Sequence, residues 1–360
     1  MLSEKILAST ELFNFKGALR QQFQPQALSN PNLALADSDS ADISSYTPQE
    51  GESRVDGTAD GSSLVKIIKR MLPLGSVVKQ EVISLGTGTW TRASRIDVTL
   101  LCGETKSYFL KRATESQGKD MMHAEYRSMM EISSHMPELV PRPIAWDKFK
   151  QSSPETYFFI MDFVDLARKW SSLRTSVASS PSFIKPNIAW ESNWCVYFTR
   201  LLTQFYDREI AQNGSQPEYQ DAYQKLVSDV VPQLLEPLQA DGRVLKPCLT
   251  HGDLWEENAG LNLATCLPVV FDASVMYAHN EMELGMWRAD PIRFGEPFYS
   301  QYLEHMPPSE PSEQFDDRNR LYSIKFKIAH CLGWPDSAPS HRQLILSDMR
   351  YLIDKYSPQQ

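Results

Sequence analysis

Hydrophobic and polar positions along the chain follow two different periods. Between about residues 64 and 165, apolar residues recur at alternate positions, as in Ile96, Val98 and Leu100. This alternation is typical of strands with one buried face. Beyond about residue 166 the apolar residues recur every three or four positions, as in Phe198, Leu201 and Leu202, which predicts amphipathic helices. The sequence therefore predicts an α+β protein, with a smaller sheet-rich part followed by a larger helical part.

Turn residues within the sheet-rich part predict a hairpin and a following helix. The pair Gly103–Glu104 predicts a turn whose return strand covers residues 107–111. A helix is expected next, because Met122, Glu125 and Met129 would share one side of it. Prolines at 141 and 143 end the helical pattern, and the apolar run 157–161 predicts another strand.

The N-terminal segment has a different composition. Residues 21–63 are rich in Ser, Asp, Gln, Pro and Gly and carry only Phe23 and Tyr46 as aromatic residues, which predicts a flexible extension. The folded part is expected to begin near Leu64 with a helical stripe. The predicted organisation is an extension over residues 1–63, a sheet-rich lobe over 64–165 and a helical lobe over 166–360.

Composition narrows the class of partner and the compartment. The formal net charge of −9 argues against a nucleic-acid-binding protein, which normally carries a basic surface. Five scattered cysteines, with no paired spacing, predict neither a disulfide framework nor a zinc site. No apolar run approaches the roughly 18 residues of a membrane span, and no signal-peptide core begins the chain. We expect a soluble, cytoplasmic monomer with no nucleic-acid or membrane partner.

The segment HGDLWEEN, residues 251–258, carries the most informative chemistry. Asp253 is followed by Asn258 five positions later and by Asp272 a further fourteen positions on, after the apolar run that ends in Phe271. Transfer of a phosphoryl group from ATP needs one carboxylate to orient the attacking hydroxyl and oxygen ligands to hold Mg²⁺. The spacing therefore predicts Asp253 as the hydroxyl-orienting base and Asn258 and Asp272 as metal ligands. The alternative for Asp253 is a turn or helix cap, and His251 is expected to anchor the loop backbone.

Lys111 and Glu125 are the second candidate pair. A lysine that ends a strand is commonly a solvated edge residue. Its functional interpretation is contact with the α- and β-phosphates of ATP, held in place by a carboxylate. Glu125 shares a helix face with Met122 and Met129, where burial would be costly unless a cation met it. The pattern favours a Lys111–Glu125 ion pair.

Other positions allow two interpretations. Gly86 and Gly88 form either an ordinary β-turn or a turn whose backbone amides approach phosphates. Trp255 is expected to pack or to border the substrate pocket. Glu256 and Glu257 are most simply solvated loop charges, and the alternative is that one of them receives a cationic amine of the substrate.

Three runs of the sequence resemble a known family. HGDLWEEN, VVFDASVMYAHNEMELGMWR and KSYFLKRA resemble the fructosamine kinase (ketosamine 3-kinase, protein-ribulosamine 3-kinase) family, and most of all its fungal-type members. The resemblance covers about residues 78–356. Its signature positions beyond the HGD loop are Tyr277, His279, Asn280, Glu281, Glu283, Gly285 and Trp287.

The resemblance implies a two-lobed protein-kinase-like fold of the aminoglycoside-phosphotransferase branch. It also implies phosphorylation, with ATP and Mg²⁺, of the 3-hydroxyl of ketosamines, either small molecules or glycated proteins whose lysines are then recovered. By motif matching, Asp253 takes the proton-acceptor position, Asn258 and Asp272 the metal positions, and Lys111 with Glu125 the phosphate-clamping pair. The resemblance further implies that adenine is held through the backbone of the linker residues Met161, Asp162, Phe163 and Val164.

The chain departs from the family pattern where Glu256 and Glu257 replace the usual small residues, and it has no cysteine between Ser84 and Arg95. Two other functions therefore remain open. One is a kinase of the same fold that acts on an aminoglycoside, choline or another amino alcohol, since a fold does not fix a substrate. The other is a catalytically inactive binding module.

Overall fold

The computed structural model describes residues 77–87, 90–149, 152–167, 190–288, 292 and 294–357. The predicted extension over residues 1–63 and the helical stripe near Leu64 lie outside these residues. The described chain forms two compact units. One, the sheet unit, comprises residues up to 167 together with 261–272, and the other, the helical unit, comprises 190–260 and 273–357. This composition matches the predicted α+β class.

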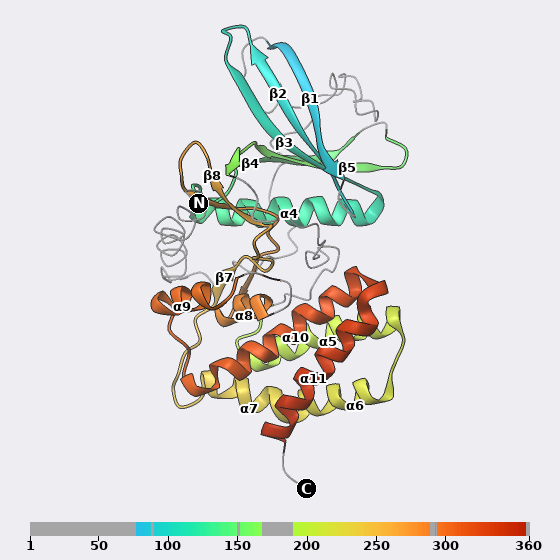
Figure 1. The fold of residues 1–360 in the computed structure, drawn as a ribbon, viewed down its shortest axis with the longest axis vertical. Helices are drawn as coiled ribbons and strands as arrows, with labels where there is room; N and C mark the ends of the chain where they lie inside the picture. Colours follow the sequence, from blue (N-terminus) through green and yellow to red (C-terminus); the bar gives the residue numbers. More distant parts are fainter. Residues whose placement is uncertain are drawn as a thin grey trace, which may run out of the picture. The chain divides into compact units, whose positions relative to one another are not determined.

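An antiparallel sheet of five strands in the order β1-β2-β3-β5-β4 dominates the sheet unit (Figure 1). The predicted hairpin is present, because Leu100 N donates to Glu104 O at 2.8 Å and Gly103 N donates to Leu100 O at 2.9 Å. The predicted helix is also present, and it packs against strands of this sheet. The elements are β1 (Val77–Thr87), β2 (Arg92–Leu100), β3 (Thr105–Thr114), α4 (Glu115–His135), β4 (Pro143–Lys148) and β5 (Thr156–Asp162).

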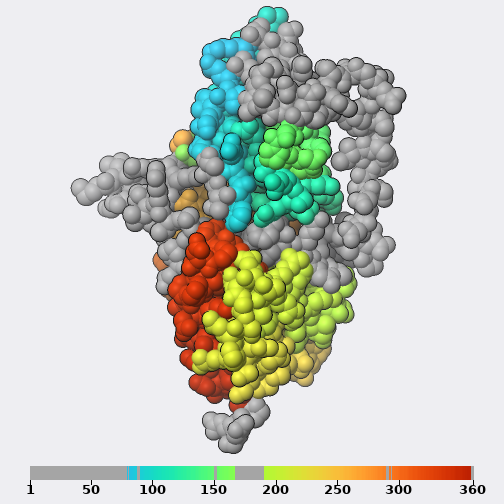
Figure 2. Space-filling view, turned by 90° about the vertical axis from the view of Figure 1, so that its right-hand side faces the viewer, coloured from blue at the N-terminus to red at the C-terminus, as the bar shows by residue number. Residues whose placement is uncertain are grey.

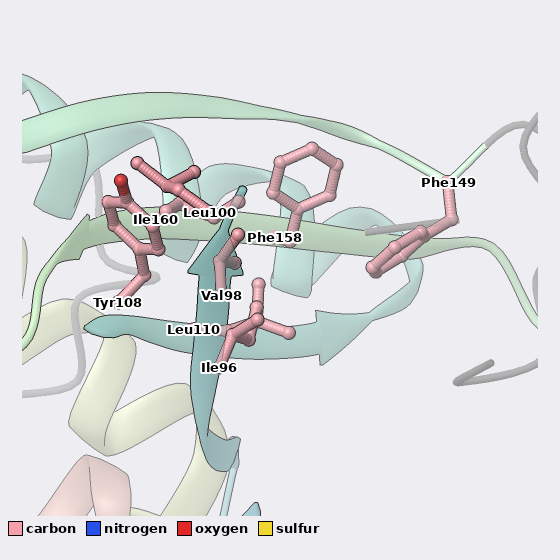
Figure 3. Packing of buried hydrophobic residues seen from close by; sticks show 8 residues of the cluster. All are labelled: Ile96, Val98, Leu100, Tyr108, Leu110, Phe149, Phe158 and Ile160. Carbon is pink, nitrogen blue, oxygen red and sulfur yellow. The ribbon is translucent and has the colours of Figure 1, made fainter. Parts of the chain in front are cut away.

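The alternation that predicted the strands separates the two faces of this sheet. One face forms an apolar cluster that includes Ile96, Val98, Leu110 and Phe158 (Figure 3). Neighbouring positions along a strand point to opposite faces, so Lys111, next to Leu110 on β3, points away from this cluster. The apolar face therefore fixes the register that presents Lys111 on the other face.

A second, three-stranded sheet joins residues from distant parts of the sequence. Its order is β6-β8-β9, with β6 (Leu166–Ala167), β8 (Ala259–Asn262) and β9 (Pro268–Val270). The backbone bonds Leu263 N to Asp165 O, 2.9 Å, and Val270 N to Leu139 O, 2.8 Å, hold residues 261–272 to the sheet unit. The sequence-based division counted this segment with the helical lobe.

The helical unit is built on amphipathic helices whose apolar stripes meet. Phe198, Leu201 and Leu202 of the predicted stripe are fully buried. Figure 2 shows the face on which the yellow residues of α6 lie beside the red ones of α11, two helices in contact. The elements are α5 (Trp194–Asn213), α6 (Pro217–Lys225), η1 (Leu226–Val230), α7 (Val231–Leu235), η2 (Glu236–Gln239), β7 (Cys248–Thr250), β10 (Met276–Ala278), α8 (Glu281–Leu284), η3 (Met286–Arg288), α9 (Glu296–His305), η4 (Ser312–Gln314), α10 (Phe315–Gly333), η5 (Pro335–Ser337) and α11 (Ala338–Tyr356).

Among the helices that the structure describes, none combines the length and the apolar character needed to cross a membrane.

Candidate active site

In the sheet unit, the ammonium group of Lys111 lies between two carboxylates. Lys111 Nζ on β3 is 2.8 Å from Glu125 Oε2 on α4 and 2.9 Å from Asp272 Oδ2, which follows β9. The Lys111–Glu125 contact is the one predicted from the helix face. The contact with Asp272 was not predicted, because it depends on the return of residues 261–272 to the sheet unit.

Burial and charge act in opposite directions on this cluster. Burial alone would lower the pKa of Lys111, but the Asp272 and Glu125 carboxylates outweigh it and raise that pKa above its usual value. Burial raises the pKa of Glu125, and the nearby Asp272 carboxylate acts in the same direction, whereas Lys111 opposes both.

In the helical unit, the loop between β7 and β8 carries Asp253 and Asn258. Both side chains are buried, at 1% and 4% exposed. Asn258 Nδ2 donates to the carboxylate oxygen Oδ2 of Asp253 at 2.8 Å and to its backbone oxygen at 2.9 Å. The side-chain nitrogen of Asn258 thus fixes the Asp253 carboxylate. His251 anchors the loop as predicted, since its Nδ1 accepts from the backbone N–H of Asp253 at 3.3 Å.

Gly252 is required by a close backbone contact. Its φ is +78°, and a Cβ added there would lie 2.1 Å from the carbonyl oxygen of Ser274. Ser274 N in turn donates to His251 O at 2.9 Å. Since an L-residue is disfavoured at positive φ and no side-chain atom fits in this space, only glycine meets both requirements here.

Two residues of the family signature support this loop from outside it. Glu283 on α8 is buried and accepts hydrogen bonds from the backbone N–H groups of His251 and of Gly252, the latter at 3.1 Å. Trp287 donates its indole N–H to the backbone oxygen of Leu254 at 2.8 Å. Burial raises the pKa of Glu283 to about 7, and the amides of His251 and Gly252 together with Lys325 oppose the rise. The sequence marked these residues only as a family pattern.

Other signature residues organise the surroundings of α8. His279 is fully buried, and its two ring nitrogens lie 2.8 Å from Tyr322 Oη and 2.9 Å from Ser309 Oγ. Glu281 forms a fully buried, bidentate ion pair with Arg318, with nitrogen–oxygen distances of 2.7 and 2.9 Å. These contacts stabilise the segment from which Glu283 reaches the loop.

The linker after β5 uses part of its own backbone internally. Asp162 N donates to Arg142 O at 3.0 Å, and Phe163 N donates to Ser107 O at 3.1 Å. Met161 lies inside the sheet, paired with strands on both sides. Within the part of the chain that the structure describes, Val164 is the linker residue whose N–H has no backbone acceptor.

The structure corrects one expectation near Asp253. Glu256 was expected to be a solvated charge, but it is buried, at 6% exposed, at the end of the buried segment 251–256. Trp255 is buried as well and packs as expected. Gly86, at the end of β1, has a φ of +139°, and Gly88 lies outside the described residues.

Comparison with known sequences points to one family. Residues 180–349 match the model of the fructosamine kinase family. A protein from Oryza sativa subsp. japonica named protein-ribulosamine 3-kinase, chloroplastic, is 29% identical over 194 residues, which are 48% of this chain and 53% of the rice protein. The family resemblance is confirmed. An Arabidopsis thaliana protein of the same name is 28% identical over 239 residues, 60% of this chain and 68% of that protein. The chain thus spans about half the length of its rice relative.

Comparison with solved structures shows the fold. A structure from Thermobifida fusca described as a "putative fructosamine-3-kinase" aligns with a TM-score of 0.57 and 17% identity, over 79% of this chain and 98% of that one. A structure of the same description from Haemophilus somnus gives 0.56 and 13%, over 80% and 96%. The predicted α+β, kinase-like fold class is therefore confirmed.

Proposed function

We propose that this protein is an ATP- and Mg²⁺-dependent phosphotransferase that phosphorylates the 3-hydroxyl of ketosamines. The substrates would be ribulosamine or fructosamine adducts on small amines or on protein lysines. The observation that carries the proposal is the buried Lys111 ammonium held by Glu125 and Asp272, because phosphoryl transfer needs a positioned cation of this kind. The family match and the names of the plant relatives supply the acceptor class.

Lys111 is proposed to bind the phosphates of ATP. Its raised pKa keeps it protonated at neutral pH, so it brings a full positive charge to the transferring group. Glu125 restricts the lysine side chain on one side, and the apolar face of the sheet restricts its backbone on the other. The linker is proposed to hold the adenine ring, with Val164 N–H as its hydrogen-bond donor.

Asp253 is proposed to orient the attacking hydroxyl of the sugar. A bond forms between the sugar oxygen and the γ-phosphorus while the bond from that phosphorus to the β–γ bridging oxygen breaks, and the hydroxyl proton passes to an Asp253 carboxylate oxygen. A sugar hydroxyl has a very high pKa, so this proton moves late in the reaction. Asn258 keeps the accepting carboxylate in one orientation through its 2.8 Å hydrogen bond.

The oxygen atoms of Asn258 and Asp272 are of the kind that Mg²⁺ prefers. Asn258 donates with its nitrogen to Asp253, which leaves its amide oxygen as the atom for a metal, and Asp272 offers a carboxylate that is 29% exposed. We propose these two residues as the metal ligands. When bound, Mg²⁺ would offset the negative charge of the phosphates.

Glu256 stands three residues after Asp253, and its carboxyl group is proposed to receive a cationic amine of the substrate. A carboxylate at this position would favour an amine-bearing sugar adduct over a neutral sugar. In a cell, phosphorylated adducts on proteins would then be released and the lysine recovered. A cytoplasmic location and a monomeric state stay predictions.

The test is to incubate the purified protein with ATP, Mg²⁺ and a ribulosamine or fructosamine, and to look for the 3-phosphate by mass spectrometry. We expect product with the wild type and at least about a hundredfold less product in the same time with Asp253→Asn. Choline and an aminoglycoside belong in the same panel. Turnover of these alone would contradict the ketosamine assignment and support the amino-alcohol kinase.

Nucleotide binding separates an enzyme from an inactive binding module. A ligand at 100 times its dissociation constant stabilises a protein by about 2.7 kcal/mol. We expect stabilisation of this order by ATP with Mg²⁺ in a thermal melt, and its absence would favour the binding module.

A further inference from the structure

Lys325 on α10 is a buried cation that the proposed reaction does not use. Lys325 is 2% exposed, and its Nζ lies 4.2 Å from the ring centroid of Phe326 and 4.9 Å from that of Phe205. Among the described residues it has no carboxylate within ion-pair distance. Burying an ammonium group without such a partner costs free energy of folding. A functional role for Lys325 would explain why this charge is buried in the helical unit.

The backbone contact between α10 and the end of α8 places Lys325 near Glu283. A Cβ added to Gly285 would lie 2.6 Å from Tyr322 Cβ and 3.0 Å from Ser323 N, so the two segments touch at this glycine. Glu283 stands two residues before Gly285, and Lys325 stands three residues after Tyr322, so Lys325 and Tyr322 lie on the same side of α10. Consistent with this, the Asp253 and Glu283 carboxylates act to raise the pKa of Lys325 against the effect of its burial.

Glu283 needs such a charge to hold the loop. Its carboxylate is 2% exposed and accepts from two backbone N–H groups, and a carboxylate accepts such bonds more strongly when it is ionised. Neutral amides alone are a weak counterpart for a buried anion, and a nearby cation favours the ionised form.

We propose that Lys325 is a positioning residue whose buried charge keeps Glu283 ionised, and thereby keeps the His251–Gly252 backbone, and with it Asp253, in place. The role of Asp253 rests on the proposed function. The effect of Lys325 on the loop does not, because it concerns the backbone alone.

The titration behaviour of the cluster agrees with this arrangement. Burial lowers the pKa of Lys325 to about 8, and Asp253 and Glu283 oppose the decrease. Among the described residues, the charged or titratable side chains that act on Glu283 are Lys325 from α10 and Tyr302 from α9, and the loop contributes the backbone N–H groups of His251 and Gly252. The helix α5 contributes the uncharged Phe205.

The test is amide hydrogen exchange of His251 and Gly252 in the full chain between pH 6 and 9, expressed as protection relative to the intrinsic exchange rate. In the wild type we expect protection to rise as Glu283 ionises. In Lys325→Met the midpoint should move up by roughly one pH unit, which is the effect of losing one nearby charge. At pH 7 such a shift lowers the ionised fraction of Glu283 from about one half to about one eleventh, so protection should fall about fivefold.

Two variants make the outcome specific. Lys327→Met on the same helix removes a lysine that pairs with Asp348, and it should leave the midpoint unchanged. In a Glu283→Gln background, Lys325→Met should have no further effect on the pH profile. If Lys325→Met instead lowers protection equally at every pH, or still acts when Glu283 is Gln, Lys325 is only a packing residue and the proposal is wrong. Neither result depends on kinase activity, so the proposed function stands or fails separately.

Discussion

At the scale of single residues, each acidic side chain of the candidate site has a different kind of partner. Asp253 accepts from the amide of Asn258, Asp272 meets the ammonium of Lys111, and Glu283 accepts from backbone N–H groups. The partner determines what each carboxylate can do. A neutral amide donor orients a carboxylate without adding a charge, whereas an ammonium neighbour favours the ionised form.

Asp253→Asn should therefore remove activity while leaving the fold intact. The substituted side chain keeps nearly the same volume but no longer accepts a proton, and loss of a general base typically costs about 10²–10⁴ in rate. Steady-state kinetics with a ketosamine and ATP measure this loss, and circular dichroism checks the fold. Asp221→Asn, on the exposed side of α6, is the control that should retain wild-type kcat.

At the scale of elements, the loop between β7 and β8 is shaped by its neighbours as much as by its own sequence. Gly252 meets the Ser274 carbonyl oxygen, and the segment carrying Glu283 and Trp287 binds the loop backbone. The shape of this loop is therefore a property of three segments together.

Gly252→Ala should destabilise the protein much more than Gly242→Ala. The two glycines have nearly the same φ, +78° and +77°, so an L-residue at either costs about 1–3 kcal/mol in backbone strain. Only at Gly252 does the added Cβ meet an atom, at 2.1 Å, because Gly242 has nothing within 4 Å. Urea unfolding of both variants measures the difference. Equal losses would show that the contact with Ser274 has no energetic weight.

The same comparison shows how far the sequence could predict this site. Alternation in β3 and helical periodicity in α4 placed Lys111 and Glu125 on facing surfaces, so their ion pair was predictable from local pattern alone. The bond from Glu283 to the loop was not, because α8 is only four residues long and gives no periodic signal. Burial of Glu256 was also missed, because the sequence shows two adjacent glutamates and gives no sign that only the first of them is buried.

At the scale of the whole molecule, the chain passes from the sheet unit to the helical unit and returns for residues 261–272 before ending in the helical unit. The hydrophobic pattern predicted both the sheet-rich part and the helical part. Residues 261–272 form only short strands, so their hydrophobic pattern is too brief to show that they return to the sheet unit.

The stability of the whole molecule depends on groups buried in each unit, and some of these groups titrate.

Acid should destabilise the protein in part through His279. Burial lowers the pKa of His279 from 6.5 to about 4, so the unfolded chain binds a proton that the folded chain excludes. Above pH 6.5 His279 is neutral in both states and does not lower the free energy of unfolding. As pH falls from 6.5 toward 4, the unfolded chain takes up the proton, and the free energy of unfolding decreases by at most about 1.4 kcal/mol per pH unit. Urea unfolding at pH 6.5 and 4.5 should show a steeper loss for the wild type than for His279→Gln. Equal slopes would mean that His279 is protonated in the folded state.

The glycine of the His-Gly-Asp tripeptide has a consequence for how distant relatives are recognised. Its presence follows from a carbonyl oxygen that belongs to a residue 22 positions away. A pseudoenzyme that has lost its reactive aspartate would still require this glycine to build the same turn. A homology search that uses this tripeptide therefore identifies proteins with the same loop conformation. Whether the aspartate is present must be checked separately before activity is inferred.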